Sequence, residues 1–172
     1  MTATIAILIV HGFLGAIDTL WNHEWKARLA STPSALPEQR VHATRGIFLT
    51  CFFAGLALFE WHGCWAWALS FVILAEIILT LVDFAIEDQT RRLPTEERVL
   101  HGILGITGGA FITTLIPHLL EWSGRDSALV SVSYGWCTWI LVAMSIGLLG
   151  FTIRDGLSIP RLRKEEGRQF DK

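Results

Sequence analysis

Five long apolar stretches restrict the fold of this 172-residue chain more than any other feature. Crossing the hydrocarbon core of a bilayer takes about 20 residues at about 1.5 Å each. The composition agrees, because 52% of the residues are apolar and only 17% are charged. The sequence therefore predicts an all-α, polytopic membrane protein with five transmembrane helices in a bundle, near Ala3–Trp21, Val41–Phe59, Cys64–Ile86, Val99–Leu120 and Ala128–Ile153.

The basic residues are distributed unevenly, and this predicts the orientation. All but one of the 14 Lys and Arg residues lie around the first connection, the third connection or the C-terminal segment, with Arg125 as the exception. Because basic segments stay in the cytoplasm, we expect the N-terminus outside and the C-terminus inside. Residues 1–158 would form the transmembrane domain and 159–172 a charged cytoplasmic tail that touches membrane lipids. The expected location is the inner (plasma) membrane, with cytoplasmic loops at Asn22–Arg40 and Glu87–Arg98.

Several classes of protein are excluded. The net charge of −2 and the lack of a basic face exclude a nucleic-acid binder. Three cysteines without a CxxC pair read as buried thiols and not as a disulfide framework. The chain has no P-loop, GxGxxG, GxSxG or HExxH motif, and none of its six histidines lies three or four residues from another. The chemistry must be read from ionisable residues inside the spans.

Two spans carry polar residues at the same spacing. His11, Asp18 and Asn22 are seven and four residues apart in the first span, and Glu76, Asp83 and Glu87 repeat this spacing in the third. At about 100° per residue, each set falls within about 40° on one helix face. A carboxylate near the bilayer centre costs about 2.5–3.5 kcal/mol, so it faces the bundle interior and finds a partner. The matched spacing predicts two facing stripes, with His11 level with Glu76 and with Asp18 and Asp83 sharing a metal ion or a proton.

Further ionisable residues are expected at the depth of Asp18 and Asp83. They come from the start of the second span, the start of the fourth span and the end of the first span. Carboxylates and imidazoles that converge from several helices are how bundle proteins build dinuclear metal sites. The predicted metal ligands are Asp18, His42, Asp83, Glu87 and His101, the predicted catalytic residues are Arg45 and Glu97, and the secondary candidates are His11, His23 and Glu76.

This donor set favours a metal-dependent membrane enzyme. Carboxylate and imidazole ligands suit two divalent ions of Fe, Mn or Zn, which activate O₂ or water. The expected activity is that of an oxidoreductase or hydrolase acting at the cytoplasmic side on a lipid-like, amphipathic or hydrophobic small molecule. Arg45 would hold an anionic group of that substrate.

Other interpretations stay open at this stage. A b-type cytochrome or quinone-linked electron carrier would bind haem through His42/His101 and His11/His118. A proton-coupled transporter would use the two stripes as a relay. Arg45 as the counter-ion of Asp18 or Asp83 would make the cluster a structural ion-pair network. Gly105 and Gly109 predict close helix packing or room for a lipid chain beside His101. The last interpretation, ranked below the others, is an assembly or structural subunit, as a homodimer or with a partner subunit.

Overall fold

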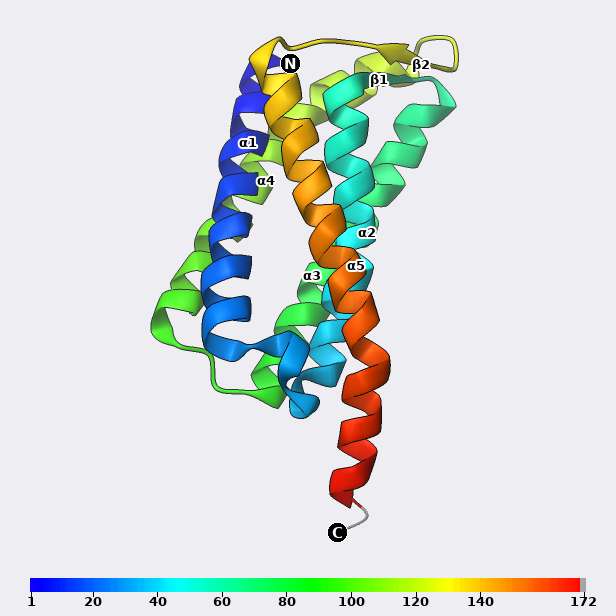
Figure 1. Cartoon of the computed structure of the whole chain (residues 1–172). Helices are drawn as coiled ribbons and strands as arrows, with labels where there is room; N and C mark the ends of the chain where they lie inside the picture. Colours follow the sequence, from blue (N-terminus) through cyan, green and yellow to red (C-terminus); the bar gives the residue numbers. More distant parts are fainter. Residues whose placement is uncertain (171–172) are drawn as a thin grey trace.

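The chain folds into a bundle of helices, seen here in a computed structural model that describes residues 1–170, with residues 169 and 170 described by their backbone alone. Figure 1 shows the helices side by side along one axis. Five of them are long and apolar enough to cross a membrane, which confirms the predicted all-α class and the number of helices that could span one. They are α1 (Thr2–Ile17), α2 (Leu36–Leu58), α3 (Cys64–Thr90), α4 (Thr95–Ser123) and α5 (Trp136–Phe170).

The helices pack in two groups, α2 with α3 and α5, and α1 with α4, and these groups contact each other through α3–α4 and α1–α5. Helix α2 packs along α5 and against α3, while α1 packs mainly on α4. The α2–α5 contact is close at Gly46, where a Cβ atom would overlap the side chain of Thr152. Small residues of this kind let helix backbones approach in a membrane.

A small antiparallel sheet covers one end of the bundle, called here the sheet end. Strand β1 (Phe59–His62) pairs with β2 (Ala128–Ser131), with Phe59 opposite Ser131. The prediction of a fifth span from Ala128 is therefore wrong at its start, because β1 offers residues 128–131 a strand partner. Helix α5 begins only after Gly135, whose φ of 61° is a left-handed conformation that favours glycine.

The opposite end, called here the polar end, carries the α1–α2 and α3–α4 connections. The first, residues 18–35, has nearly the predicted length but begins earlier, and the second is shorter than predicted. The first contains a π-helix, η1 (Asp18–Ala27), and two short 3₁₀ turns, η2 (Leu29–Ser31) and η3 (Pro33–Ala35). Helix α2 then begins at Leu36, with a proline in its first turn, where the missing N–H costs nothing. The second connection is only residues 91–94.

The segment predicted as a separate tail continues α5. The helix passes through Pro160 and extends to Phe170, and Leu162 on it is fully buried. The last two residues of the predicted tail, Asp171 and Lys172, lie outside the described residues.

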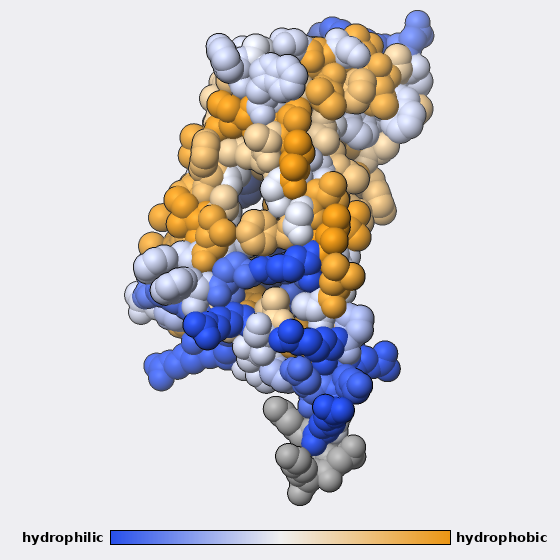
Figure 2. All heavy atoms as spheres, in the orientation of Figure 1, coloured by the Kyte–Doolittle hydropathy of each residue, from blue (hydrophilic) through white to orange (hydrophobic). Residues whose placement is uncertain are grey.

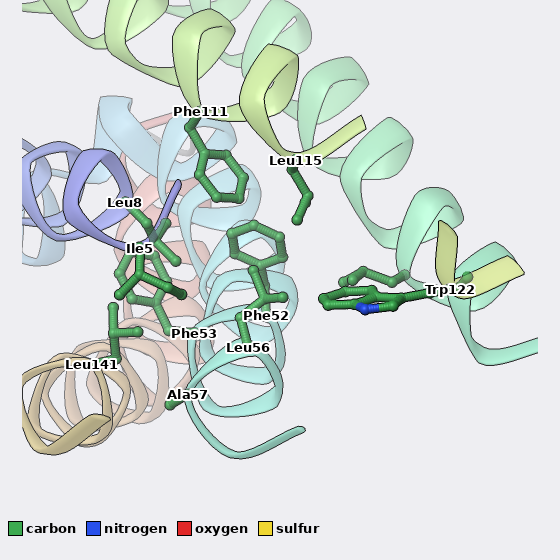
Figure 3. Packing of buried hydrophobic residues seen from close by; sticks show 12 residues of the cluster. Ile5, Leu8, Phe52, Phe53, Leu56, Ala57, Phe111, Leu115, Trp122 and Leu141 are labelled. Atoms are coloured by element: carbon green, nitrogen blue, oxygen red, sulfur yellow. The ribbon is translucent and has the colours of Figure 1, made fainter. Parts of the chain in front are cut away.

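The apolar core fills the sheet end of the bundle. Its side chains come from all five helices, and Figure 3 shows them pointing toward one another. The ring of Phe52 meets Phe53 and Phe111 edge-on, at centroid distances of 6.0 and 5.3 Å. The buried members are Ile5, Leu8, Phe52, Phe53, Leu56, Ala57, Ala66, Leu69, Phe111, Leu115, Trp122 and Leu141. This half of the bundle has an apolar, closely packed interior.

The outer surface is also apolar. Large hydrophobic side chains such as Ile106 and Leu157 are three-quarters exposed. Figure 2 shows hydrophobic atoms over most of the bundle's length, while hydrophilic atoms gather around the polar end. A helix that is apolar on its outer face and inside the bundle is typical of a membrane span, so this chain has the composition of a membrane protein.

Candidate metal centre

A buried cluster of carboxylates and imidazoles lies at the polar end, where the sequence predicts it. All its members are charged or titratable, and they come from α2, α3, α4 and the π-helix η1. They are Asp18, His23, Glu38, His42, Asp83, Glu87, Glu97 and His101. Six of them are less than a tenth exposed, and His42 and His101 are partly buried. Burying so many polar groups is costly unless each is paired or binds an ion.

The π-helix η1 explains why the first span contributes more than one ligand. Its Asp18 and His23 are five residues apart, which is the i→i+5 hydrogen-bond spacing of a π-helix, and both are buried. In an α-helix they would point about 140° apart. Asn22 also turns inward and donates a hydrogen bond of 2.7 Å to Asp18. π-helical turns are frequent at functional sites, and this one brings His23 from a secondary candidate into the centre of the cluster.

The first group of possible ligands consists of Asp18, His23, Glu97 and His101. His101 Nε2 lies 3.0 Å from Asp18 Oδ2. His23 Nε2 lies 3.5 Å from both Asp18 Oδ2 and Glu97 Oε1, which is too long for a good hydrogen bond. Each of the four offers a ligand atom, and these atoms lie within 4.8 Å of one another.

Two further groups adjoin the first. One consists of His42, Asp83 and Glu87, and the other links His23 and His42 through Glu38. His42 Nε2 lies 3.4 Å from Asp83 Oδ2, and the rings of His23 and His42 are 4.4 Å apart. Since His23 and His42 each belong to two groups, the cluster is one continuous polar region.

Several buried atoms of the cluster have no hydrogen-bond partner among the described residues. Both ring nitrogens of His23 are unpaired, although only 4% of this residue is exposed. Asp83 and Glu87 are 2% and 1% exposed, and each has one unpaired carboxylate oxygen. His42 Nε2 is a further unpaired atom. An unpaired buried polar group costs about 1–3 kcal/mol, so such a concentration calls for a ligand.

Arg45 lies on the side of the cluster nearer the sheet end, and its single positive charge is shared by two carboxylates. Its guanidinium donates hydrogen bonds of 2.6 Å to Asp83 and of 2.9 and 3.1 Å to Glu76. Arg45 is therefore the counter-ion of Asp83, one of the two possibilities that the sequence left open. Asp18 instead contacts Asn22 and His101. The hydrogen bonds of the Arg45 guanidinium are therefore made to carboxylates within the bundle.

Arg91, in the α3–α4 connection, contacts the cluster from the polar end. The sequence did not identify it as a site residue. It donates hydrogen bonds to Glu38, Glu97 and Glu87, at shortest distances of 2.9, 2.6 and 3.5 Å. Each of these three carboxylates belongs to a different ligand group. Hydrogen bonding to Glu97 and Glu38 raises the pKa of the Arg91 guanidinium above its ordinary value.

Glu38 is the second residue that the sequence analysis missed. It is fully buried, yet it fell in a segment predicted as a loop. Two signals indicate it: Pro37 marks a helix start, and Glu38 precedes His42 by four residues, which places both on one helix face.

The two predicted stripes do not face each other. Because α1 packs on α4 and not on α3, His11 lies 2.9 Å from Thr107, while Glu76 bonds to Arg45. His11 and Glu76 therefore have different partners, and the prediction that their stripes face each other is wrong. Asp18 and Asp83 likewise fall in different ligand groups. They are connected through the histidines between them and through Glu87, whose Oε2 lies 3.4 Å from His101 Nδ1.

Two other predictions concern residues outside the cluster. Cβ atoms at Gly105 and Gly109 would meet nothing within 4 Å, so this GxxxG pair makes no close helix contact within the described chain. At the sheet end, His62 lies 3.0 Å from Glu60 and 3.2 Å from Arg125, as expected for a residue away from the site.

Comparisons with family models, with curated proteins and with solved structures found no match to this chain.

Proposed function

We propose that this protein is an integral membrane metalloenzyme with two divalent cations at the polar end of its bundle. The observation that supports this most strongly is the set of unpaired, deeply buried donor atoms on His23, His42, Asp83 and Glu87. These are the oxygen and imidazole ligands that Fe, Mn and Zn prefer.

The charge balance favours two cations. Six carboxylates lie in or beside the cluster, and two arginines contact them, so four negative charges are left when the histidines are neutral. Two divalent ions would cancel these four charges. The carboxylates are Asp18, Glu38, Glu76, Asp83, Glu87 and Glu97, and the arginines are Arg45 and Arg91.

The separations of the donor atoms fit the same proposal. Metal–ligand bonds of about 2.0–2.2 Å in a tetrahedral site place neighbouring ligand atoms about 3.3–3.6 Å apart. The contacts of His23 with Asp18 and Glu97 measure 3.5 Å, and that of His42 with Asp83 measures 3.4 Å. These separations are long for hydrogen bonds, and they match the spacing of two atoms that bind a shared ion.

The roles of the residues follow from their contacts. Asp18, His23, Glu97 and His101 would hold one ion, and His42, Asp83 and Glu87 the other, with Glu38 between the groups. Such ions supply activation of O₂ or water. Arg45 and Arg91 orient the carboxylates, as residues around a metal site commonly do. By the distribution of basic residues, the polar end faces the cytoplasm from the inner (plasma) membrane, and the substrate is a lipid-like or hydrophobic molecule.

The alternative functions fit the structure less well. His23 lies next to both His42 and His101, with ring centroids 4.4 and 6.2 Å away, and so fills the place where a haem would lie between them. A proton relay across the membrane would have to pass the apolar core of the sheet end, which Figure 3 shows filled with hydrocarbon side chains.

Metal analysis of the full-length protein in detergent tests the proposal. We expect about two transition-metal ions per chain, a sharp loss in Asp83→Ala and His101→Ala, and no loss in His62→Ala. His62 is a matched control because it is also a buried, carboxylate-bonded histidine, at the other end of the bundle. A Soret band, or metal retained in Asp83→Ala and lost in His62→Ala, would overturn the proposal.

A further inference from the structure

Gly15 lies on the interior face of α1, yet it borders open space. It follows the fully buried Leu8 by seven residues, so both point within about 20° of the same direction. One turn earlier, a Cβ atom at Gly12 would lie only 2.9 Å from Phe53 and Met144. At Gly15 a Cβ atom would meet nothing within 4 Å. The packing of α1 against the bundle therefore opens between Gly12 and Asp18.

This space is visible from outside. Figure 2 shows a hollow in the face of the bundle between the α1 side and the α5 side, with mostly hydrophobic atoms beside it, hydrophilic atoms in its depth and a band of hydrophilic atoms on the side toward the polar end. Arg45 and Glu76, which belong to interior helix faces, are 21% and 20% exposed in their side chains. The hollow itself opens to the side of the bundle, which in a bilayer would be hydrocarbon.

The inner end of the hollow lies close to the metal centre. Gly15 precedes Asp18 by three residues, which is a rise of about 4.5 Å along the helix. Beyond Asp18 lie the unpaired atoms of His23 and Asp83, in residues that are 4% and 2% exposed. A molecule in the hollow would therefore approach the buried donor atoms from the membrane side.

The charges around the hollow indicate which part of a molecule it accepts. Arg45 is already bonded to Glu76 and Asp83, so it is not available for an anionic headgroup. Burying an unpaired anion there would be costly, whereas hydrocarbon fits the apolar rim. This argues against the expectation that Arg45 binds an anionic part of the substrate.

We propose that the hollow beside Gly15 binds a single acyl chain, which enters from the bilayer and lies with its methylenes next to the metal centre. This inference rests on the proposed function and specifies its substrate class: a lipid positioned by its hydrocarbon chain, whose headgroup stays at the membrane surface.

Photo-crosslinking with a palmitic acid analogue that carries a mid-chain diazirine tests this. On the full-length protein in lipid nanodiscs, we expect labelled peptides around Gly15. The side chain of Gly15→Leu would fill the hollow and clash with the acyl chain. A clash of about 1.4 kcal/mol corresponds to a tenfold loss of binding, so labelling should fall about tenfold or more. The matched control is Gly150→Leu, because Gly150 is exposed on α5 and a Cβ there also meets nothing within 4 Å. If Gly15→Leu fails to insert, Gly15→Ala, a better helix former than glycine, should still lower labelling by a smaller factor.

The outcomes separate this inference from the proposed function. Gly15→Leu should keep the metal content of the wild type, since it removes no ligand. Equal labelling of Gly15→Leu and Gly150→Leu would overturn the acyl-chain site even if metal is bound. Competition by a quinone analogue and not by unlabelled palmitate would overturn it as well. Labelling that depends on Gly15 in a protein without metal would support the site and contradict the proposed function.

Discussion

Removing the cations should destabilise this protein because, with neutral histidines, four carboxylate charges would be left without a balancing cation in a buried site. A ligand that binds only the folded state at 100 times its dissociation constant stabilises it by about 2.7 kcal/mol. For a chain of this length, 1 kcal/mol corresponds to about 2–4 °C in melting temperature. Each of the two proposed ions is therefore worth about 5–10 °C.

The assay is thermal melting of the detergent-solubilised protein with and without a chelator, followed through its 8 tryptophans. The double variant Asp18→Asn/Asp83→Asn removes one ligand from each proposed ion, so chelator should barely change its melting temperature. Asp155→Asn is the matched control: Asp155 is also a buried aspartate paired with an arginine, but it lies on α5 outside the ligand groups. It should respond to chelator like the wild type. If the wild type binds no metal and melts equally in both conditions, the cluster is an ion-pair network and the reasoning fails.

Three further predictions concern orientation, packing and charge. A cysteine placed in residues 91–94 should be shielded from an impermeant thiol reagent in intact cells, while one at Asp126 should react; the reverse pattern would invert the proposed topology. Gly46→Ala should destabilise the protein by about 1–3 kcal/mol in unfolding experiments, because its Cβ would overlap Thr152, whereas Gly150→Ala should not. Arg91→Gln should enlarge the loss of melting temperature on chelation, since the site then carries one more uncompensated negative charge; a smaller loss would show that Arg91 does not balance these carboxylates.

The sequence by itself determined the class of fold and the position of the candidate site along the helices. Five apolar stretches of sufficient length leave few alternatives to membrane-spanning helices. Charged residues within such stretches are so costly that they must gather inside the bundle, so Asp18, Asp83, Glu87 and His101 were found without a structure.

The tertiary structure decided which of these residues meet. Helical spacing fixes the face on which a residue lies, but not the helix that packs against that face. The sequence therefore matched α1 to α3, whereas α1 packs on α4 and separates His11 from Glu76. Local deviations from the α-helix were also invisible in the pattern: the π-helix that turns His23 inward is stabilised by its surroundings, and the pairing of β1 with β2 depends on residues about 70 positions apart. Arg91 and Glu38 became part of the site only because two short connections fold back onto one cluster, which no local pattern of residues encodes.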